Sequence, residues 1–200
     1  YKYEVTTNST GKVVYRSSNT AVAEPDQFGY ITIKKAGSCT ITARVAADAN
    51  YKSASAGYQL VVSKKDMTKK KVKLSKTSYI YAGKNCKPKA VVSGLARSDY
   101  KVTYKNADKP GTAICVITGK GNYSGKIEVP YSINLAKTVI TKITNKKSGV
   151  SLTWKKVAGA KGYRIYRRTK NGSWKRIREL TSGKKVSFTD KTAKSGKTYE

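Results

Sequence analysis

The stretch Gly-Thr-Ala-Ile-Cys-Val-Ile-Thr-Gly-Lys-Gly-Asn-Tyr, residues 111–123, combines a run of β-favouring residues with a Gly-Lys-Gly turn and an Asn-Tyr end. An upstream stretch has the same plan: it opens at Gly37 with Gly-Ser-Cys-Thr-Ile-Thr-Ala-Arg-Val and reaches Asn50-Tyr51. A further β-rich run follows each stretch, at 58–62 and 131–135. Gly37 and Gly111 are 74 positions apart. Two diverged copies at this spacing predict tandem domains of one architecture, each ending in a strand-turn-strand unit.

Composition supports an all-β chain of small domains. Two hundred residues with an internal repeat predict two or three domains, each large enough for a sandwich core. Only 38% of the residues are hydrophobic, but Val, Ile, Thr and 15 Tyr suit a pleated, half-buried surface. No run of 18 apolar residues occurs, so we expect no membrane insertion in this segment.

The first domain is expected to span residues 1–63. Strands are predicted at 3–6, 13–16, 30–34, 40–45 and 58–62, at a spacing typical of a sandwich. The motifs are Tyr15-Arg16-Ser17-Ser18-Asn19, Val22-Ala23, Gly29-Tyr30-Ile31-Thr32 and Lys35-Ala36-Gly37-Ser38-Cys39-Thr40-Ile41-Thr42. In these residues the chain resembles the bacterial Ig-like repeats (group 2 type) of surface proteins. The resemblance implies an Ig-like sandwich whose first strand is missing here.

A second domain is expected at residues 64–135. The polar, basic stretch 63–74 is interpreted as a linker leading into it. Strands are predicted at 72–75, 79–81, 87–93, 100–104, 112–118 and 127–133. The motifs Tyr81-Ala82-Gly83-Lys84, Asp99-Tyr100-Lys101-Val102-Thr103-Tyr104 and Gly119-Lys120-Gly121-Asn122-Tyr123 resemble a second type of bacterial Ig-like repeat.

Residues 136–200 form the third expected domain. Val150-Ser151-Leu152-Thr153-Trp154 is followed by Gly162-Tyr163-Arg164-Ile165-Tyr166-Arg167-Arg168, and Asn171-Gly172 is a hairpin signal before 174–180. Together with Ser187-Phe188-Thr189-Asp190 and Gly196-Lys197-Thr198-Tyr199, these runs resemble fibronectin type III domains. In that family the Trp anchors the core and the final Tyr begins the sixth strand. The last strands are therefore expected to be missing, which leaves unpaired edges.

Charge is the strongest compositional signal. Residues 1–63 carry 7 basic and 4 acidic residues (+3), residues 64–134 carry 16 and 4 (+12), and residues 135–200 carry 19 and 3 (+16). Such a field attracts polyanions, although it is also the ordinary surface of a highly soluble protein. The candidate polyanion contacts are Lys69, Lys70, Lys71, Lys73, Arg164, Arg167, Arg168, Lys175, Arg176 and Arg178.

The sequence argues against an enzyme. The absence of His removes the Ser-His and Cys-His pairs and, with only three Cys, ordinary zinc sites. Glu24 and Asp26 are the one close carboxylate pair, and we interpret them as turn residues. Asp190 is interpreted as a hydrogen-bonding loop residue rather than a base. We therefore expect no catalytic residues, no metal site and no cofactor.

The cysteines are expected inside the sandwiches. Cys39 and Cys115 are in phase with inward-facing residues of their strands, as small buried hydrophobes would be. Under the Ig-like resemblance, Cys86 and Cys115 are a possible inter-sheet disulfide, with two reduced core thiols as the equal alternative. Cys39 is the unpaired third thiol.

These observations favour tandem Ig-like β-sandwiches that act as non-catalytic spacer or adhesion modules of a bacterial surface or secreted protein. The expected location is extracellular. Two alternatives remain: a basic module that binds cell-wall polymers, glycans or nucleic acid, and an accessory region of a secreted hydrolase. The expected partners are anionic cell-wall polymers, glycans or host surface proteins, and any binding to nucleic acid should be non-specific.

Overall fold

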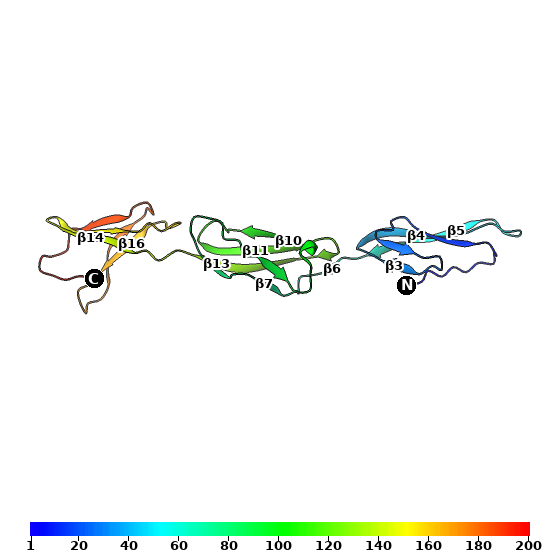
Figure 1. The fold of residues 1–200 in the computed structure, drawn as a ribbon, viewed down its shortest axis with the longest axis horizontal. Helices are drawn as coiled ribbons and strands as arrows, with labels where there is room; N and C mark the ends of the chain where they lie inside the picture. The colour runs from blue at the N-terminus through cyan, green and yellow to red at the C-terminus, as the bar shows by residue number, and fades with distance from the viewer. The chain divides into compact units, whose positions relative to one another are not determined.

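The computed structural model describes all residues from Tyr1 to Glu200, and nearly all of its regular elements are β-strands (Figure 1). One short 3-10 helix, η1 (Arg97–Asp99), interrupts the strands, and there is no α-helix. The predicted all-β class is confirmed. No helix of the structure has the length and apolar character needed to cross a membrane.

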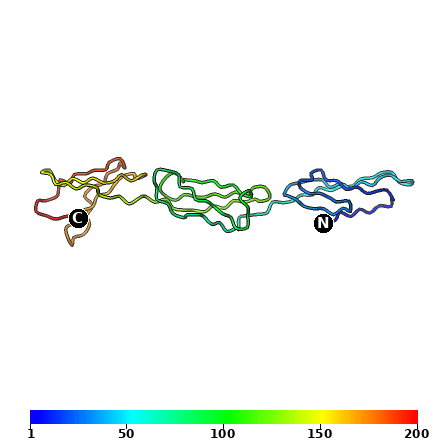
Figure 2. The backbone as a smooth tube through the Cα atoms, viewed as in Figure 1, coloured from blue at the N-terminus to red at the C-terminus, as the bar shows by residue number.

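The chain divides into two compact units. The first comprises Tyr1–Lys73, Val91–Thr103 and Val116–Glu128, and the second comprises Leu74–Ala90, Tyr104–Cys115 and Val129–Glu200. In Figure 2 the blue and cyan part of the backbone belongs to the first unit, and the yellow to red part belongs to the second.

Residues near the N-terminus form two small antiparallel sheets. The first has the order β1 (Val13–Ser17), β4 (Gly37–Val45), β5 (Ala54–Val62), and the second pairs β2 (Ala23–Pro25) with β3 (Ile31–Ile33). In the first sheet Val13 lies opposite Val45, and Val45 lies opposite Ala54. The buried core between these elements consists of Val22, Ala23, Ile31, Cys39 and Ile41, flanked by Tyr3, Tyr58, Leu60 and Val62.

The strand prediction for this region is largely confirmed, but one predicted strand is wrong and strand β2 was missed. The predicted strands at 13–16, 30–34, 40–45 and 58–62 correspond to β1, β3, β4 and β5. The strand predicted at 3–6 is wrong, because only a single bridge joins Lys2 to Tyr30. Two backbone hydrogen bonds, from the Tyr3 N–H to the Gly29 carbonyl and from the Ile31 N–H to the Tyr1 carbonyl, hold this segment together with ring contacts. The Tyr3 and Tyr58 rings meet edge to face at 4.9 Å between centroids.

Eight strands follow in the middle of the chain. They are β6 (Lys65–Asp66), β7 (Val72–Leu74), β8 (Ser78–Ile80), β9 (Ala90–Val92), β10 (Tyr100–Lys105), β11 (Gly111–Gly119), β12 (Tyr123–Ser124) and β13 (Lys126–Asn134). One sheet has the order β10, β11, β13, β8, and two further pairs are β7 with β9 and β6 with β12. Strand β11 carries the buried residues Ala113, Cys115 and Ile117 on alternate positions. The repeat stretch at 111–123 thus supplies a central strand of the largest sheet.

The linker interpretation of residues 63–74 is wrong. Lys65 and Asp66 pair in parallel with Tyr123 and Ser124, and the backbone N–H of Met67 donates to the carbonyl of Ser124. The Met67 side chain has 0% exposure. The lysines of this stretch are solvated while Met67 and Leu74 point into the core, so its high charge concealed an alternation of buried and exposed positions.

The C-terminal strands form two sheets. One has the order β14 (Ile140–Lys146), β15 (Gly149–Trp154), β18 (Ser187–Asp190), and the other pairs β16 (Tyr163–Arg167) with β17 (Lys175–Leu180). Trp154, Ile165 and Leu180 form the buried cluster, and the Trp154 and Tyr163 rings meet at 5.2 Å. The hairpin signal is confirmed, because Asn171 has φ +64° and Gly172 closes the turn onto Thr169. The run 196–199 is not a strand and contributes one bridge, from Tyr199 to Thr169.

A basic groove as the candidate functional site

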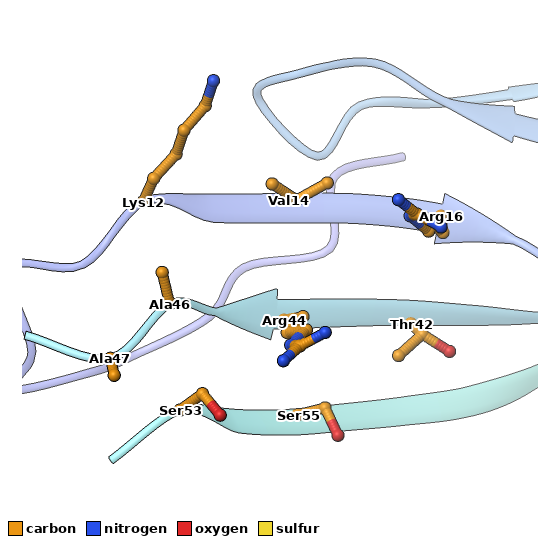
Figure 3. A pocket seen from close by; sticks show the side chains of 9 residues that line it. All are labelled: Lys12, Val14, Arg16, Thr42, Arg44, Ala46, Ala47, Ser53 and Ser55. Carbon is orange, nitrogen blue, oxygen red and sulfur yellow. The ribbon is translucent and has the colours of Figure 1, made fainter. Parts of the chain in front are cut away.

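A shallow groove of about 600 Å³ lies on the outer face of the sheet formed by β1, β4 and β5 (Figure 3). Figure 3 shows Lys12, Val14 and Arg16 along β1 and its start, with Arg44 on the neighbouring strand β4. The other residues that line the groove are Thr42, Ala46, Ala47, Ser53 and Ser55.

Strand alternation places these residues on one face. In β4 the side chains of Ile41, Ala43 and Val45 are buried, so Thr42 and Arg44 lie on the opposite face of the strand. The register then brings Val14 opposite Arg44, and Arg44 opposite Ser55. Because the β5 side of the groove carries small residues, the Arg44 guanidinium remains open to solvent.

The groove is positively charged without compensation. Three cations line it, and no carboxylate does. Lys12, Arg16 and Arg44 have no salt-bridge partner, whereas Lys2 and Lys34 of the same region pair with Glu4 and Glu24. An anion that enters the groove therefore meets charges that no protein carboxylate neutralises.

A hydrogen-bonded loop borders the groove beyond Ala46 and Ala47. The Asp48 carboxylate accepts hydrogen bonds from the Ser9 hydroxyl at 2.8 Å and the Thr10 N–H at 2.7 Å. It also accepts from the N–H groups of Asn50 and Tyr51. These donors, led by Ser9, hold the pKa of Asp48 well below its ordinary value of 3.8. Asp48 thus remains a carboxylate that fixes its own loop.

The sequence-predicted lysine contacts lie apart from this groove. Lys69 and Lys70 occupy the turn after Met67, where the N–H of Lys70 donates to the Met67 carbonyl, and Lys71 and Lys73 flank the start of β7. Lys69, Lys71 and Lys73 are exposed and Lys70 is half-buried. Their contact with a polyanion remains a prediction.

Four of the six predicted contacts near the C-terminus already have carboxylate partners. Arg164 and Arg176 both pair with Glu179, and Arg168 pairs with Glu200. Arg167 donates to the buried Asp190 at 2.6 Å. These ion pairs reduce the charge that the four arginines offer to an anion. Lys175 and Arg178 have no such partner, and the role of all six remains a prediction.

Aromatic rings further shape the surface around the paired arginines. The Arg168 guanidinium stacks on the Trp174 ring at 4.6 Å, and Arg167 stacks on Tyr199 at 4.4 Å. Trp174 is 53% exposed, in contrast to the 6% of Trp154. Arg167 and Arg168 thus contact both a carboxylate and an aromatic ring within the protein, which leaves them less available to an external anion.

The carboxylates considered as catalytic candidates have structural partners. Asp26 accepts hydrogen bonds from the N–H groups of Phe28 and Tyr30, so its interpretation as a turn residue is confirmed. The same interpretation of Glu24 is wrong, because Glu24 lies within strand β2 and pairs with Lys34. Asp190 accepts hydrogen bonds from Thr192 and Arg167, as expected, but it is the last residue of strand β18 rather than a loop residue. Burial opposes ionisation of Asp190, but these hydrogen bonds and the Arg167 charge lower its pKa overall. No group of three or more His, Cys, Asp or Glu side chains is arranged to hold a metal ion.

All three cysteines are buried. Cys39 packs with Val22, Ile31 and Ile41, as its strand phase predicted. The Tyr131 hydroxyl donates to the Cys86 carbonyl at 2.6 Å, and burial raises the pKa of Tyr131 to about 12. Burial also raises the pKa of the Cys115 thiol. A Cys86–Cys115 disulfide remains a prediction, which alkylation and mass spectrometry of protein prepared without reductant would test.

Lys12, Arg16 and Arg44 were not identified by the sequence analysis, which gave weight to runs of basic residues. The alternation along β1 could have identified Arg16, because Val14 and Arg16 alternate with the half-buried Val13 and Tyr15 and so lie on the exposed face of the strand. What the sequence could not supply is the register that places Arg44 beside Val14.

Residues 6–48 match the family model described as "Intimin, immunoglobulin-like domain". The matched segment contains β1 to β4 and therefore all three cations of the groove, Lys12, Arg16 and Arg44. No curated protein matches the chain.

Proposed function

We propose that this chain is a non-catalytic extracellular module of a bacterial surface protein, acting as a spacer or adhesion stalk. The observation that carries the proposal is the match of residues 6–48 to an intimin Ig-like domain. The all-β architecture agrees with it, because β-sandwiches are the architecture of many cell-surface domains. The likeness of residues 136–200 to fibronectin type III domains belongs to the same proposal.

Surface labelling tests this proposal. Antibodies raised against the chain should bind intact cells of the source bacterium or the material that these cells secrete, and protease added to intact cells should remove the signal. Detection only after the cells are permeabilised would overturn the extracellular assignment. A cytoplasmic protein of known location serves as the control for cell integrity.

The basic groove supports a second candidate function, the binding of a polyanion. Lys12, Arg16 and Arg44 have no carboxylate partner and lie together on one face of the sheet. A high net charge alone does not require the cations to gather on one face without partners. Binding through such contacts releases counterions, so affinity should fall steeply between about 50 and 200 mM salt. Chromatography on heparin and on immobilised phosphate polymer at several salt concentrations measures this. Retention that is insensitive to salt would argue for a receptor contact with an apolar centre instead.

A further inference from the structure

The three groove cations follow each other at a regular interval along the sheet. The N–H of Ala46 donates to the Lys12 carbonyl, and Val14 lies opposite Arg44. Arg44 is therefore level with the midpoint between Lys12 and Arg16 (Figure 3). Two strand residues rise by about 6.6 Å, and adjacent strands are about 5 Å apart. Lys12, Arg44 and Arg16 thus mark three positions spaced about 6.6 Å apart along the strand direction, alternating between two neighbouring strands.

We propose that this groove binds an extended phosphodiester polymer whose phosphates are bridged by three carbons, with successive phosphates on Lys12, Arg44 and Arg16. Each repeat of such a polymer contains six backbone bonds: two P–O, two O–C and two C–C. Two residues of a polypeptide also contain six backbone bonds of similar length and extend by about 6.6 Å. The polymer repeat therefore matches the spacing of the three positions along the strand direction. This inference deepens the polyanion candidate under Proposed function and rests on it.

The side chains of the groove suit phosphates and polyol hydroxyls. Each Arg presents a planar fork that can donate two hydrogen bonds to one phosphate, and Lys12 supplies a point charge. Thr42, Ser53 and Ser55 add hydroxyl groups that can exchange hydrogen bonds with a hydroxylated backbone. The small residues on β5 leave room for a chain to lie along the sheet rather than stand on it.

The groove is less suited to single-stranded nucleic acid, which has the same six-bond repeat. Proteins that bind single strands without sequence preference stack successive bases on aromatic rings. None of the nine residues that line the groove is aromatic. The lining therefore favours a polyol phosphate, such as poly(glycerol phosphate), over a nucleic acid strand.

Oligomers of defined length test the spacing. Binding of the purified chain to glycerol phosphate oligomers with one, two, three and five phosphates should strengthen by about fivefold per phosphate at about 0.1 M salt, up to three phosphates. Beyond three the gain should be small, because the groove offers no fourth cation. A steady increase through five phosphates would show diffuse attraction and overturn the proposal. Equal or tighter binding of oligothymidylate would assign the groove to nucleic acid instead.

Charge-matched variants test the residues. The triple variant Lys12→Gln/Arg16→Gln/Arg44→Gln should bind the three-phosphate oligomer about 100-fold more weakly, and the slope of log affinity against log salt should become about 2 units shallower. The control Lys35→Gln/Lys64→Gln/Lys84→Gln removes the same charge at exposed positions outside the groove and outside the other candidate contacts. Equal losses in both variants would overturn the proposal, and circular dichroism confirms that both are folded.

The two proposals fail separately. If intact cells carry the chain but the oligomers do not bind it, the groove proposal fails and the spacer proposal stands. If the chain is found only inside cells, the extracellular proposal fails whatever the oligomers do.

Discussion

At the residue scale, the buried ion pair between Arg167 and Asp190 links two strands that belong to different sheets, β16 and β18. Asp190 is 4% exposed and also accepts hydrogen bonds from the hydroxyl and the N–H of Thr192. Removing one partner of such an ion pair is strongly destabilising, mainly because the other charge is left buried without a partner.

Replacing Asp190 with Ala should lower the free energy of unfolding of residues 136–200 by about 2–4 kcal/mol, because Arg167 loses its carboxylate and Thr192 loses its acceptor. Urea denaturation followed by tryptophan fluorescence measures the change. Glu179→Gln is the control, because its ion pairs with Arg164 and Arg176 are exposed and should contribute less than about 1 kcal/mol. Equal effects of the two substitutions would show that burial of Asp190 has no special role.

Asp48 predicts a specific dependence of stability on acid. Its folded-state pKa is depressed, so its contribution to stability is present above the ordinary value of 3.8 and is lost as pH falls from there toward the folded-state value. The wild-type protein should therefore be more stable than Asp48→Asn at pH 7, and the difference should shrink below about pH 4. Urea denaturation of both proteins from pH 7 to pH 2 measures it. A difference that stays constant over this range would contradict the hydrogen-bond network.

At the element scale, two glycines with nearly equal φ angles lie in different surroundings. Gly149 begins β15 with φ +128°, and a Cβ there would lie 2.2 Å from the carbonyl oxygen of Asp190. Gly111 begins β11 with φ +131°, and nothing lies within 4 Å of a Cβ built there. A larger residue would therefore be strained in its backbone at both sites, but its side chain would clash with neighbouring atoms only at Gly149.

Gly149→Ala should destabilise residues 136–200 more than Gly111→Ala destabilises the region around β11. Strain alone costs about 1–3 kcal/mol, and the clash at Gly149 must in addition move β15 away from β18. Hydrogen exchange of the β15 and β18 amides measures the local effect. Similar losses of protection at both sites would show that conformational strain outweighs the close approach.

The sequence predicted strands well where their hydrophobic phase was clear, as in β1, β4 and β11. It failed where charge masked the phase, because Lys65 and Asp66 concealed a paired strand next to the buried Met67. The groove was missed for another reason: its cations come from separate strands, and only the β1–β4 register brings Arg44 level with Val14. Local pattern determines the face of a side chain, whereas pairing between distant strands determines its neighbours.

At the scale of the whole molecule, strands β10, β11 and β13 each pass from one compact unit into the other. A boundary between independently folding domains that cut these strands would break their ladders. Boundaries placed in the short segments before β6 and after β13 would cut no strand, because these segments contain none. The expected division at 1–63, 64–135 and 136–200 agrees with these segments and is our proposal for the domains.

A fragment of residues 64–135 should fold by itself and unfold in one cooperative transition, since it retains β6 to β13 intact. Circular dichroism in urea measures this. A fragment that begins at Val91 should remain unfolded, because it lacks β6 to β8 and the first residue of β9. If the 64–135 fragment is also unfolded, the proposed domain division is wrong.

The two tryptophans of the chain both lie in residues 136–200, one in the core and one on the surface. Indole emission therefore reports on this part of the chain, while the 15 tyrosines report on all of it. Trp154 should emit at the shorter wavelength because apolar side chains surround it. Trp174, beneath a guanidinium in a strongly cationic region, should be quenched by iodide far more than by caesium. The emission of Trp154 thus reports on core packing, and the quenching of Trp174 reports on the local surface potential.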